Sequence, residues 1–395
     1  MKHSVDRILT THAGSLPRPP ELLDVLKSGD GAALEQGTNA ERLRSAVSEI
    51  VRRQTALGID VIDDGEYGKP SFVSYINERL GGYEVDTRAG PRNQWLSSRE
   101  GRSFPEFYAQ THPASTHTHM ICTGPITYKG HTQLKRDIEN LKSALQGIAV
   151  EDVFMPAISP SNIEDWQKNA YYKSQEEYVF AIAEAMREEY QAIVDAGFLV
   201  QIDDPRLVTY YIIHPEASIE DCRKWAELRI AALNHALRDI PTEKIRFHTC
   251  YGINMGPRIH DMELKDIVDL ILTIRAGAYS FEAANPRHEH EWKVWKNVQA
   301  SGRQNPHSGS HLAFDNPRRA SGAGGGPDHS LRRDRRPRQR DRRIGLRLRH
   351  FRGIKRSSSV DRLGQAQSAQ RWRPDRVQTV VAPLGRVRIN SPRPL

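Results

Sequence analysis

A histidine and a cysteine stand two residues apart in His248-Thr249-Cys250, and Glu282 follows later in the chain. Alternate residues of a β-strand point to the same side, so this imidazole and this thiol could hold one ion. Imidazole, thiolate and carboxylate together form a ligand set that suits Zn²⁺. The alternative is that Cys250 is a small buried hydrophobe, which is the commoner role of an isolated cysteine.

Carboxylates gather in two other short segments, Asp63-Asp64-Gly65-Glu66 and Asp203-Asp204-Pro205. Glu66 and Asp203 are candidates to hold a cationic group of a substrate. Asp63 and Asp64 have a simpler interpretation as capping or solvated loop residues, because aspartate readily accepts hydrogen bonds from the backbone N–H groups that follow it.

Three other histidines and two other cysteines are not expected to bind a metal. His260, His288 and His290 are expected on solvated loops, and Cys122 and Cys222 in structural positions. Three cysteines in 395 residues do not form a disulfide framework, and they fit a reducing, cytoplasmic compartment.

Most candidate residues end a short apolar segment that is typical of a strand. Strands are expected at Ile8–Ser15, Val61–Glu66, His119–Thr127, Val153–Ser159, Leu199–Asp204, Ile245–Cys250 and Tyr279–Ala284, and helices at Asn39–Leu57, Ser174–Ala196, Ile219–Arg238 and Leu264–Ala276. This alternation favours a parallel α/β fold. Polar clusters at the strand ends favour a TIM-type (β/α)8 barrel, whose chemistry lies at that end of its strands.

The charge of the chain changes sign near residue 298. Residues 299–395 carry 23 Lys and Arg, 6 Asp and no Glu, a net charge of +17, whereas residues 1–298 have a net charge of −9. We therefore divide the chain into an enzyme-like region, 1–298, and an Arg-rich tail, 299–395, which we expect to be disordered. No apolar run is long enough for a membrane span. The first residues lack the apolar run and small-residue cleavage site of an export signal, so we do not expect export.

Five motifs occur in order along residues 1–298. They are Thr10-Thr11-His12-Ala13-Gly14-Ser15 with Pro17, Asp64-Gly65-Glu66, Gln201-Ile202-Asp203-Asp204-Pro205, His248-Thr249-Cys250 and Ser280-Phe281-Glu282. In type and order they resemble the catalytic domain of cobalamin-independent methionine synthase and, more closely, the shorter single-barrel relatives of that domain.

The resemblance implies a TIM barrel that transfers a methyl group from methyltetrahydrofolate to homocysteine, with a zinc ion that binds the thiol as thiolate. It implies that His248, Cys250 and Glu282 are zinc ligands. It also implies that Ser15, Glu66 and Asp203 bind the amino acid part of homocysteine. The alternative is a related single-barrel zinc alkyltransferase that acts on another thiol.

One part of the family's pattern is absent. The family has a fourth zinc ligand, a cysteine in an Asp-Cys-Gly motif at the last strand, and no cysteine follows Cys250 here. One extra nucleotide after codon 298 would explain this. Without it, codons that fit residues 298–315 encode V-K-L-P-D-G-K-I-L-I-P-G-V-I-S-H-S-T, a strand ending in histidine. Codons that fit residues 345–354 then encode G-S-D-C-G-T-F-A-G-S, which contains the missing motif.

We therefore expect an incomplete barrel. Residues 1–298 would supply six of the eight strands, with His119–Thr127 outside the barrel, and the out-of-frame tail would replace the last two. Six strands alone would leave open edges and an inactive or weakened enzyme.

A basic tail could instead bind nucleic acid through its phosphates. This tail has only three aromatic residues and no repeated Arg-Gly-Gly or Arg-Ser units, so stacking on bases is not favoured. We expect small-molecule partners, homocysteine or another small thiol and methyltetrahydrofolate, and no specific nucleic acid.

Overall fold

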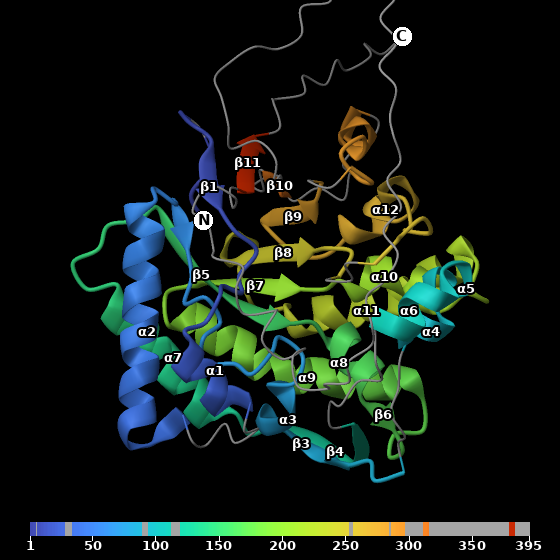
Figure 1. Ribbon diagram of the computed structural model, residues 1–395, viewed down its shortest axis with the longest axis horizontal. Helices are drawn as coiled ribbons and strands as arrows, with labels where there is room; N and C mark the ends of the chain where they lie inside the picture. Colours follow the sequence, from blue (N-terminus) through green and yellow to red (C-terminus); the bar gives the residue numbers. More distant parts are fainter. Residues whose placement is uncertain are drawn as a thin grey trace, which may run out of the picture.

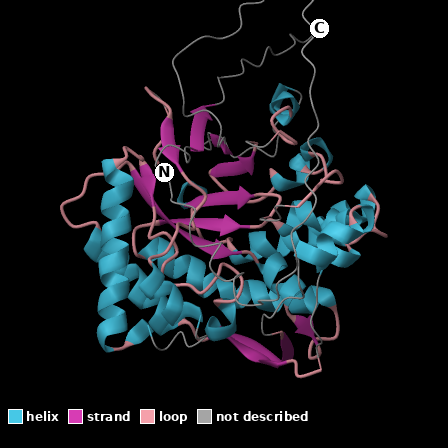
Figure 2. Cartoon of the chain, viewed as in Figure 1, coloured by secondary structure: helices cyan, strands magenta, loops and turns pink. Residues whose placement is uncertain are grey.

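Six parallel strands form one curled sheet that carries the candidate residues (Figures 1 and 2). In this computed structural model they are β1 (Leu9–Thr11), β2 (Val61–Ile62), β5 (Asp152–Ile158), β7 (Leu199–Asp203), β8 (Ile245–Thr249) and β9 (Ala278–Glu282). Each is parallel to its neighbour in the order β1-β2-β5-β7-β8-β9. The predicted TIM-type architecture, with six of its strands supplied by residues 1–298, is therefore confirmed.

Two strands of the tail occupy the remaining positions of the barrel. The structure describes residues 1–4, 6–27, 34–88, 94–111, 119–252, 256–283 and 286–296, and the backbone of β10 (His311–Asp315) and β11 (Thr379–Pro383). β10 is parallel to β9, whereas β11 is antiparallel to both β10 and β1. The edges expected to be open are thus paired. The disorder predicted for the rest of 299–395 lies outside the described residues.

Helices lie around the curled sheet (Figure 2). The longer ones are α1 (Pro20–Lys27), α2 (Gly37–Ala56), α7 (His131–Ala144), α9 (Gln175–Asp195), α10 (Arg206–Ile213) and α11 (Ile219–Ala236). The shorter ones are α3 (Ile76–Arg79), α4 (Gln94–Ser97), α5 (Arg99–Ser103), α6 (Pro105–Thr111), α8 (Pro160–Trp166) and α12 (Val268–Ile271), with 3-10 helices η2 (Thr242–Lys244), η3 (Leu264–Asp266) and η4 (Glu291–Lys296). Serine side chains cap the first turns of α8, α9 and α11.

Three of the four predicted helices match α2, α9 and α11 to within a few residues. The fourth prediction, Leu264–Ala276, is wrong in extent, since η3 and α12 cover only part of it. Ile267, Ile271 and Ile274 are buried in this segment. Its apolar periodicity therefore reflects core contacts of an irregular stretch rather than one continuous helix.

A second sheet lies outside the barrel, at the bottom of the view in Figure 1. It has the order β3-β4-β6, with β3 at Leu80–Val85, β4 at Met120–Tyr128 and β6 at Lys168–Asn169. The predicted position of His119–Thr127 outside the barrel is confirmed. The sequence does not predict β3, because Gly81 and Gly82 interrupt its apolar pattern, or β6, which has only two residues.

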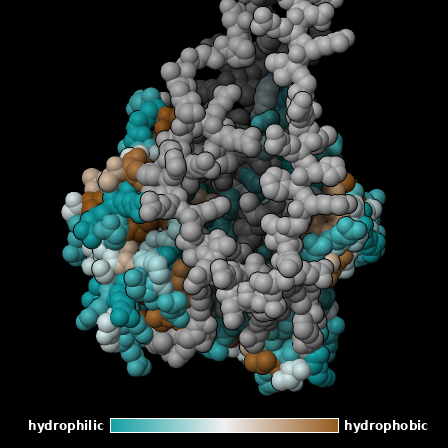
Figure 3. Space-filling view, viewed as in Figure 1, coloured by the Kyte–Doolittle hydropathy of each residue, from teal (hydrophilic) through white to brown (hydrophobic). Residues whose placement is uncertain are grey.

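The surface seen in Figure 3 is mostly hydrophilic on both flanks, and its apolar side chains lie in separate small patches. The large hydrophobic residues that are most exposed, Ile259 and Val85, come from separate loops and strands. No helix in the described ranges has the length and apolar character needed to cross a bilayer.

A buried arginine joins the helices on one side of the barrel. Arg79 lies 2.6 Å from Asp137 on α7 and 3.1 Å from Glu189 on α9. Tyr75 and Tyr128 donate to the same Glu189 carboxylate at 3.0 and 2.8 Å. All five side chains are buried, so loss of the arginine would leave Glu189 without this counter-ion in an apolar environment.

Replacing Arg79 by methionine should therefore lower the free energy of unfolding by about 3–5 kcal/mol. Urea denaturation followed by circular dichroism measures this change. The matched control is Arg223→Met, because Arg223 pairs with Asp269 at 2.7 Å near the surface, where the loss should be about 1 kcal/mol or less. Equal losses in the two variants would contradict the importance of the buried network.

Candidate functional site

The loop after β2 turns sharply at two aspartates. Asp63 accepts a hydrogen bond from Gly65 N at 2.8 Å, and Asp64 accepts one from Glu66 N at 2.9 Å. Both aspartates are buried, so they cap this turn without lying in solvent. Glu66 has a φ of 57° and is the only non-glycine residue with a left-handed backbone in the described part of the chain. Such a conformation is strained and persists where the surroundings fix it.

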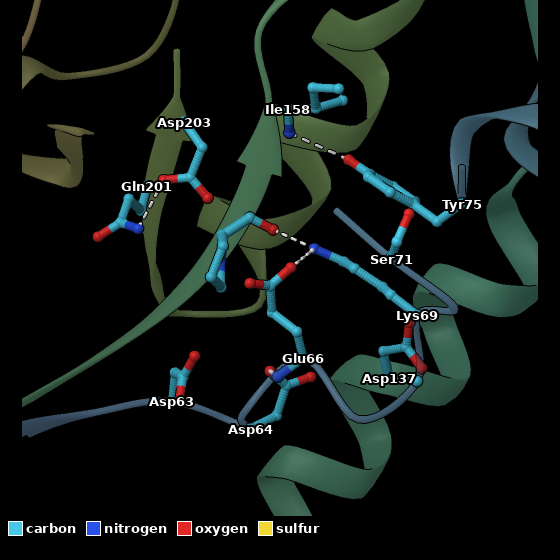
Figure 4. Close-up of polar contacts among 12 residues, drawn as sticks. Asp63, Asp64, Glu66, Lys69, Ser71, Tyr75, Asp137, Ile158, Gln201 and Asp203 are labelled. Carbon is cyan, nitrogen blue, oxygen red and sulfur yellow. Dashed lines mark hydrogen bonds and ion pairs between the residues drawn. The ribbon is translucent and has the colours of Figure 1, made fainter. Parts of the chain in front are cut away.

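Two cations contact Glu66, and Figure 4 shows one of them, Lys69, beside its carboxylate. Arg18 donates to the Glu66 carbonyl oxygen at 2.6 Å and to Lys69 O at 2.9 Å. The Lys69 ammonium lies 3.5 Å from the Glu66 carboxylate, and it donates to Pro156 O at 2.5 Å. The same ammonium lies 4.6 Å from the centre of the Tyr75 ring. Glu66 and Lys69 are both buried, so the predicted substrate-binding carboxylate already has a counter-ion of its own.

Asp203 ends β7, and Gln201 lies two residues before it on the same strand (Figure 4). Gln201 donates to Asp203 Oδ1 at 2.7 Å and to Ala13 O at 2.5 Å. Burial raises the pKa of Asp203 well above its ordinary value, and the negative charge of Glu66 raises it further. Asp203 therefore lies close enough to Glu66 for that charge to disfavour its ionised form.

Ser15 follows β1 on a loop that passes close to Glu66. The preceding residue, Gly14, has a φ of 138°, and a Cβ atom there would come within 2.9 Å of Pro156 Cγ and 3.1 Å of Glu66 Oε1. Glycine is required by both the backbone angle and this close approach. Ser15 itself is exposed. The structure thus places Ser15, Glu66 and Asp203 at one end of the barrel.

The predicted metal ligands lie at the ends of two neighbouring strands, β8 and β9. His248 Nδ1 is 3.1 Å from Ser280 Oγ, and burial followed by the nearby Arg246 charge lowers the pKa of His248 to about 3, so its imidazole is neutral. Cys250, directly after β8, is half-buried. Glu282 accepts a hydrogen bond from the backbone N–H of the residue after Cys250, at 2.8 Å.

By type, His248, Cys250 and Glu282 match the ligands that zinc prefers. Their arrangement does not make a metal centre, because no three His, Cys, Asp or Glu side chains within the described ranges converge closely enough to hold an ion. No cysteine follows Cys250 in the sequence to complete a tetrahedral set. The residues present therefore do not fit a complete zinc site.

Sequence reasoning misses two buried cations of the site, Lys69 and Arg246. No pattern around Lys69 distinguishes it from an ordinary loop residue. Arg246 lies two residues before His248, so strand alternation could have placed it inside the barrel. His12 is missed as well. Its Nε2 is 2.7 Å from Gln54 Oε1, and burial lowers the pKa of His12 to about 4.

The prediction of a solvated loop is wrong for His288. Its ring is buried, stacks on Tyr251 with 3.7 Å between ring centres, and lies 3.1 Å from Asp261 and 3.0 Å from Glu291. Burial disfavours the charged imidazole, but the two carboxylates outweigh it and raise the pKa of His288. The ring therefore links the segment after β8 to the segment after β9.

The other predictions for single histidines and cysteines concern His260, His290, Cys122 and Cys222. His290 is exposed, and His260 is half-buried with its Nε2 2.8 Å from Ser103 Oγ. Cys122 and Cys222 are buried, and burial raises the pKa of the Cys222 thiol to about 11. Their structural assignment is confirmed.

Sequence comparison connects this barrel to a known family. The sequence model of the cobalamin-independent synthase catalytic domain matches residues 8–293. The chain belongs to this family. Methionine synthase of Sulfolobus acidocaldarius is 26% identical over 255 residues, and the match spans 64% of this chain and 64% of that protein. Methionine synthase of Saccharolobus islandicus is 25% identical over 261 residues, 65% of this chain and 68% of that protein.

Structural comparison agrees on the fold of this family member. A Listeria monocytogenes protein described as a vitamin-B12-independent methionine synthase superposes with a TM-score of 0.51. The sequence identity is 17%, and the match covers 81% of this chain and 84% of the other. At this identity the comparison supports the fold alone.

Replacing Asp64 by asparagine should change how stability depends on pH. Burial raises the pKa of Asp64 to about 6, so the folded barrel keeps a proton that the unfolded chain releases near pH 4. Relative to the variant, the wild type should lose on the order of 3 kcal/mol of unfolding free energy as pH rises from 4 to 7. The amide oxygen can still accept from Glu66 N. Urea denaturation at pH 4, 5, 6 and 7 measures the difference, and parallel curves would contradict it.

Proposed function

We propose that residues 1–298 form the barrel of an enzyme that transfers the methyl group of 5-methyltetrahydrofolate to the thiol of homocysteine, giving methionine. Membership of the cobalamin-independent synthase family supports this activity, and so do the relatives named methionine synthase. The observation that carries the proposal is the pair of buried carboxylates, Glu66 and Asp203, at the carboxyl end of the barrel strands. We place the reaction in the cytoplasm.

In this proposal, Ser15, Glu66 and Asp203 bind the amino acid part of homocysteine. The two carboxylates suit its ammonium group, and the exposed hydroxyl of Ser15 can donate to its carboxylate. Burial favours the protonated form of Asp203, whereas an ammonium beside it would favour the ionised form. Binding of the substrate is then coupled to release of a proton from Asp203.

His248, Cys250 and Glu282 are the proposed zinc ligands. When bound, zinc would supply the thiolate form of the substrate at neutral pH. The neutral imidazole of His248 supports the assignment, because only the unprotonated ring can bind a metal. The set stops at three residues that do not converge in the described structure, so we propose weak zinc binding and low activity for this chain.

We propose further that residues 299–395 are translated out of frame. The change of charge near residue 298 supports this, and the family match ends at residue 293. The antiparallel direction of β11 also departs from the uniformly parallel strands of a TIM-type barrel.

The nucleotide sequence at codon 298 tests the reading frame, and deleting one base there should restore a family-like C-terminus. The repaired chain should hold stoichiometric zinc after dialysis and form methionine from homocysteine. The 395-residue chain should hold less zinc and show little transfer. Elemental analysis and a methionine assay measure the two properties. Stoichiometric zinc with measurable transfer in the 395-residue chain would refute the proposed defect.

Cys250→Ser should remove the residual zinc of the 395-residue chain, because it replaces the only proposed thiolate ligand with a weaker donor. Cys122→Ala is the matched control, since Cys122 is buried in the small sheet outside the barrel. Zinc titration with a chromophoric chelator compares the two. If both variants keep the zinc content of the wild type, the ligand assignment is wrong.

A family member that acts on another thiol is the second candidate, and Lys69 favours it. Its ammonium already lies beside Glu66, so the site could also receive a thiol whose polar end is an anion without an amino group. Methyl transfer by the repaired chain to homocysteine and to thiols that lack the ammonium group separates the two candidates.

A further inference from the structure

An arginine crosses the interior of the barrel. Arg246, on β8, donates to Thr11 Oγ1 and to His12 O at the end of β1, both at 2.8 Å. In the circular order of the eight strands, β1 and β8 are four places apart in either direction, so they form opposite walls. The guanidinium also lies 4.4 Å from the centre of the Phe154 ring on β5. Arg246 is buried, so these bonds are made inside the barrel.

A second hydrogen bond across the barrel is made to Ala13, the residue after His12. Gln201, on β7, donates to Ala13 O at 2.5 Å. Each of residues 11–13 therefore accepts a hydrogen bond from a side chain of β7 or β8, across the interior of the barrel. They lead directly into the turn at Gly14 and to Ser15.

The guanidinium suits this position better than another cation would. It is a planar fork that can donate to two acceptors at fixed angles, which a lysine ammonium cannot do in the same way. One acceptor is a backbone carbonyl, so the bond defines the path of the chain itself. The Arg246 charge also acts on the site, because it partly offsets the rise that burial causes in the pKa of Asp203.

We infer that Arg246 is a positioning residue that holds the loop after β1 in the conformation that packs Gly14 against Glu66 and so fixes the position of Ser15. It acts through the backbone of the loop and does not itself touch the substrate. The part of this inference that concerns Ser15 and substrate rests on the proposed function, whereas the anchoring of the loop does not.

Hydrogen exchange of the full-length chain tests the anchoring. Gly14 N donates to His12 Nδ1 at 3.2 Å, and Leu16 N donates to Gly65 O at 3.1 Å. The first bond depends on the conformation of the loop, and the second depends on its position beside the turn after β2. In Arg246→Met, exchange of these two amides should be faster by at least about tenfold, because local opening becomes easier.

The control is Arg229→Met. Arg229 is also buried, donates to Glu164 at 2.8 Å and lies 4.7 Å from the centre of the Trp225 ring, but it belongs to α11 outside the barrel interior. Its loss should reduce stability without changing exchange in the loop after β1. If Arg246→Met does not fold, Arg246→Lys replaces it, with a smaller but measurable increase in exchange. Equal loop exchange in the Arg246 and Arg229 variants would overturn the inference.

Binding of methionine, the proposed product, separates this inference from the proposed function. In calorimetric titrations, Arg246→Met should bind methionine at least about tenfold more weakly than Arg229→Met. The reason is that Ser15, the proposed contact residue on the released loop, no longer keeps the position that binding requires. Wild type that binds no methionine would refute the proposed function, while the exchange data would still decide the anchoring. Faster loop exchange with unchanged methionine affinity would overturn the positioning of Ser15 for substrate.

Discussion

The barrel depends on satisfying the polar side chains that its central strands bury. The interior of a TIM-type barrel is normally filled by branched apolar residues. Here β7 and β8 instead contribute Gln201, Asp203, Arg246 and His248, all of them buried. A buried polar group without a partner is costly, so these residues restrict the arrangement of the strands as well as the chemistry of the site. The bonds from Arg246 to the end of β1 meet this requirement between walls that are not neighbours in the sheet.

The same requirement gives different roles to carboxylates that look alike in the sequence. Asp63 and Asp64 accept bonds from the turn that follows them. Asp204 accepts from Ser161 at 2.6 Å and from the first amides of α10, so it is a capping residue. Glu66 and Asp203 lie at the carboxyl end of the barrel strands, each beside one polar partner from its own segment. Their neighbours, rather than their residue type, therefore make them the binding candidates.

These differences explain how far the sequence could be used for prediction. Strand alternation and polar strand ends predict the six parallel strands and place Glu66 and Asp203 at one end of the barrel, because these signals are local. The pairing of Lys69 with Glu66 and the burial of His288 depend on contacts between distant segments, which periodicity does not contain. The continuous helix predicted at Leu264–Ala276 fails for a related reason, since buried apolar residues can occur at helical spacing in an irregular segment.

The sheet of this chain can close without completing the proposed metal site, because the two depend on different features of the last strands. Backbone hydrogen bonding can close a sheet with almost any sequence, and β10 and β11 do so beside β9 and β1. A site at the carboxyl end of the barrel strands also requires that each contributing strand has its carboxyl end on that side of the barrel. Because β11 is antiparallel to β1, its carboxyl end lies at the opposite end of the barrel from Ser15. A strand in that direction fills the gap in the sheet, but its own carboxyl end lies away from the strand ends that carry the proposed zinc ligands.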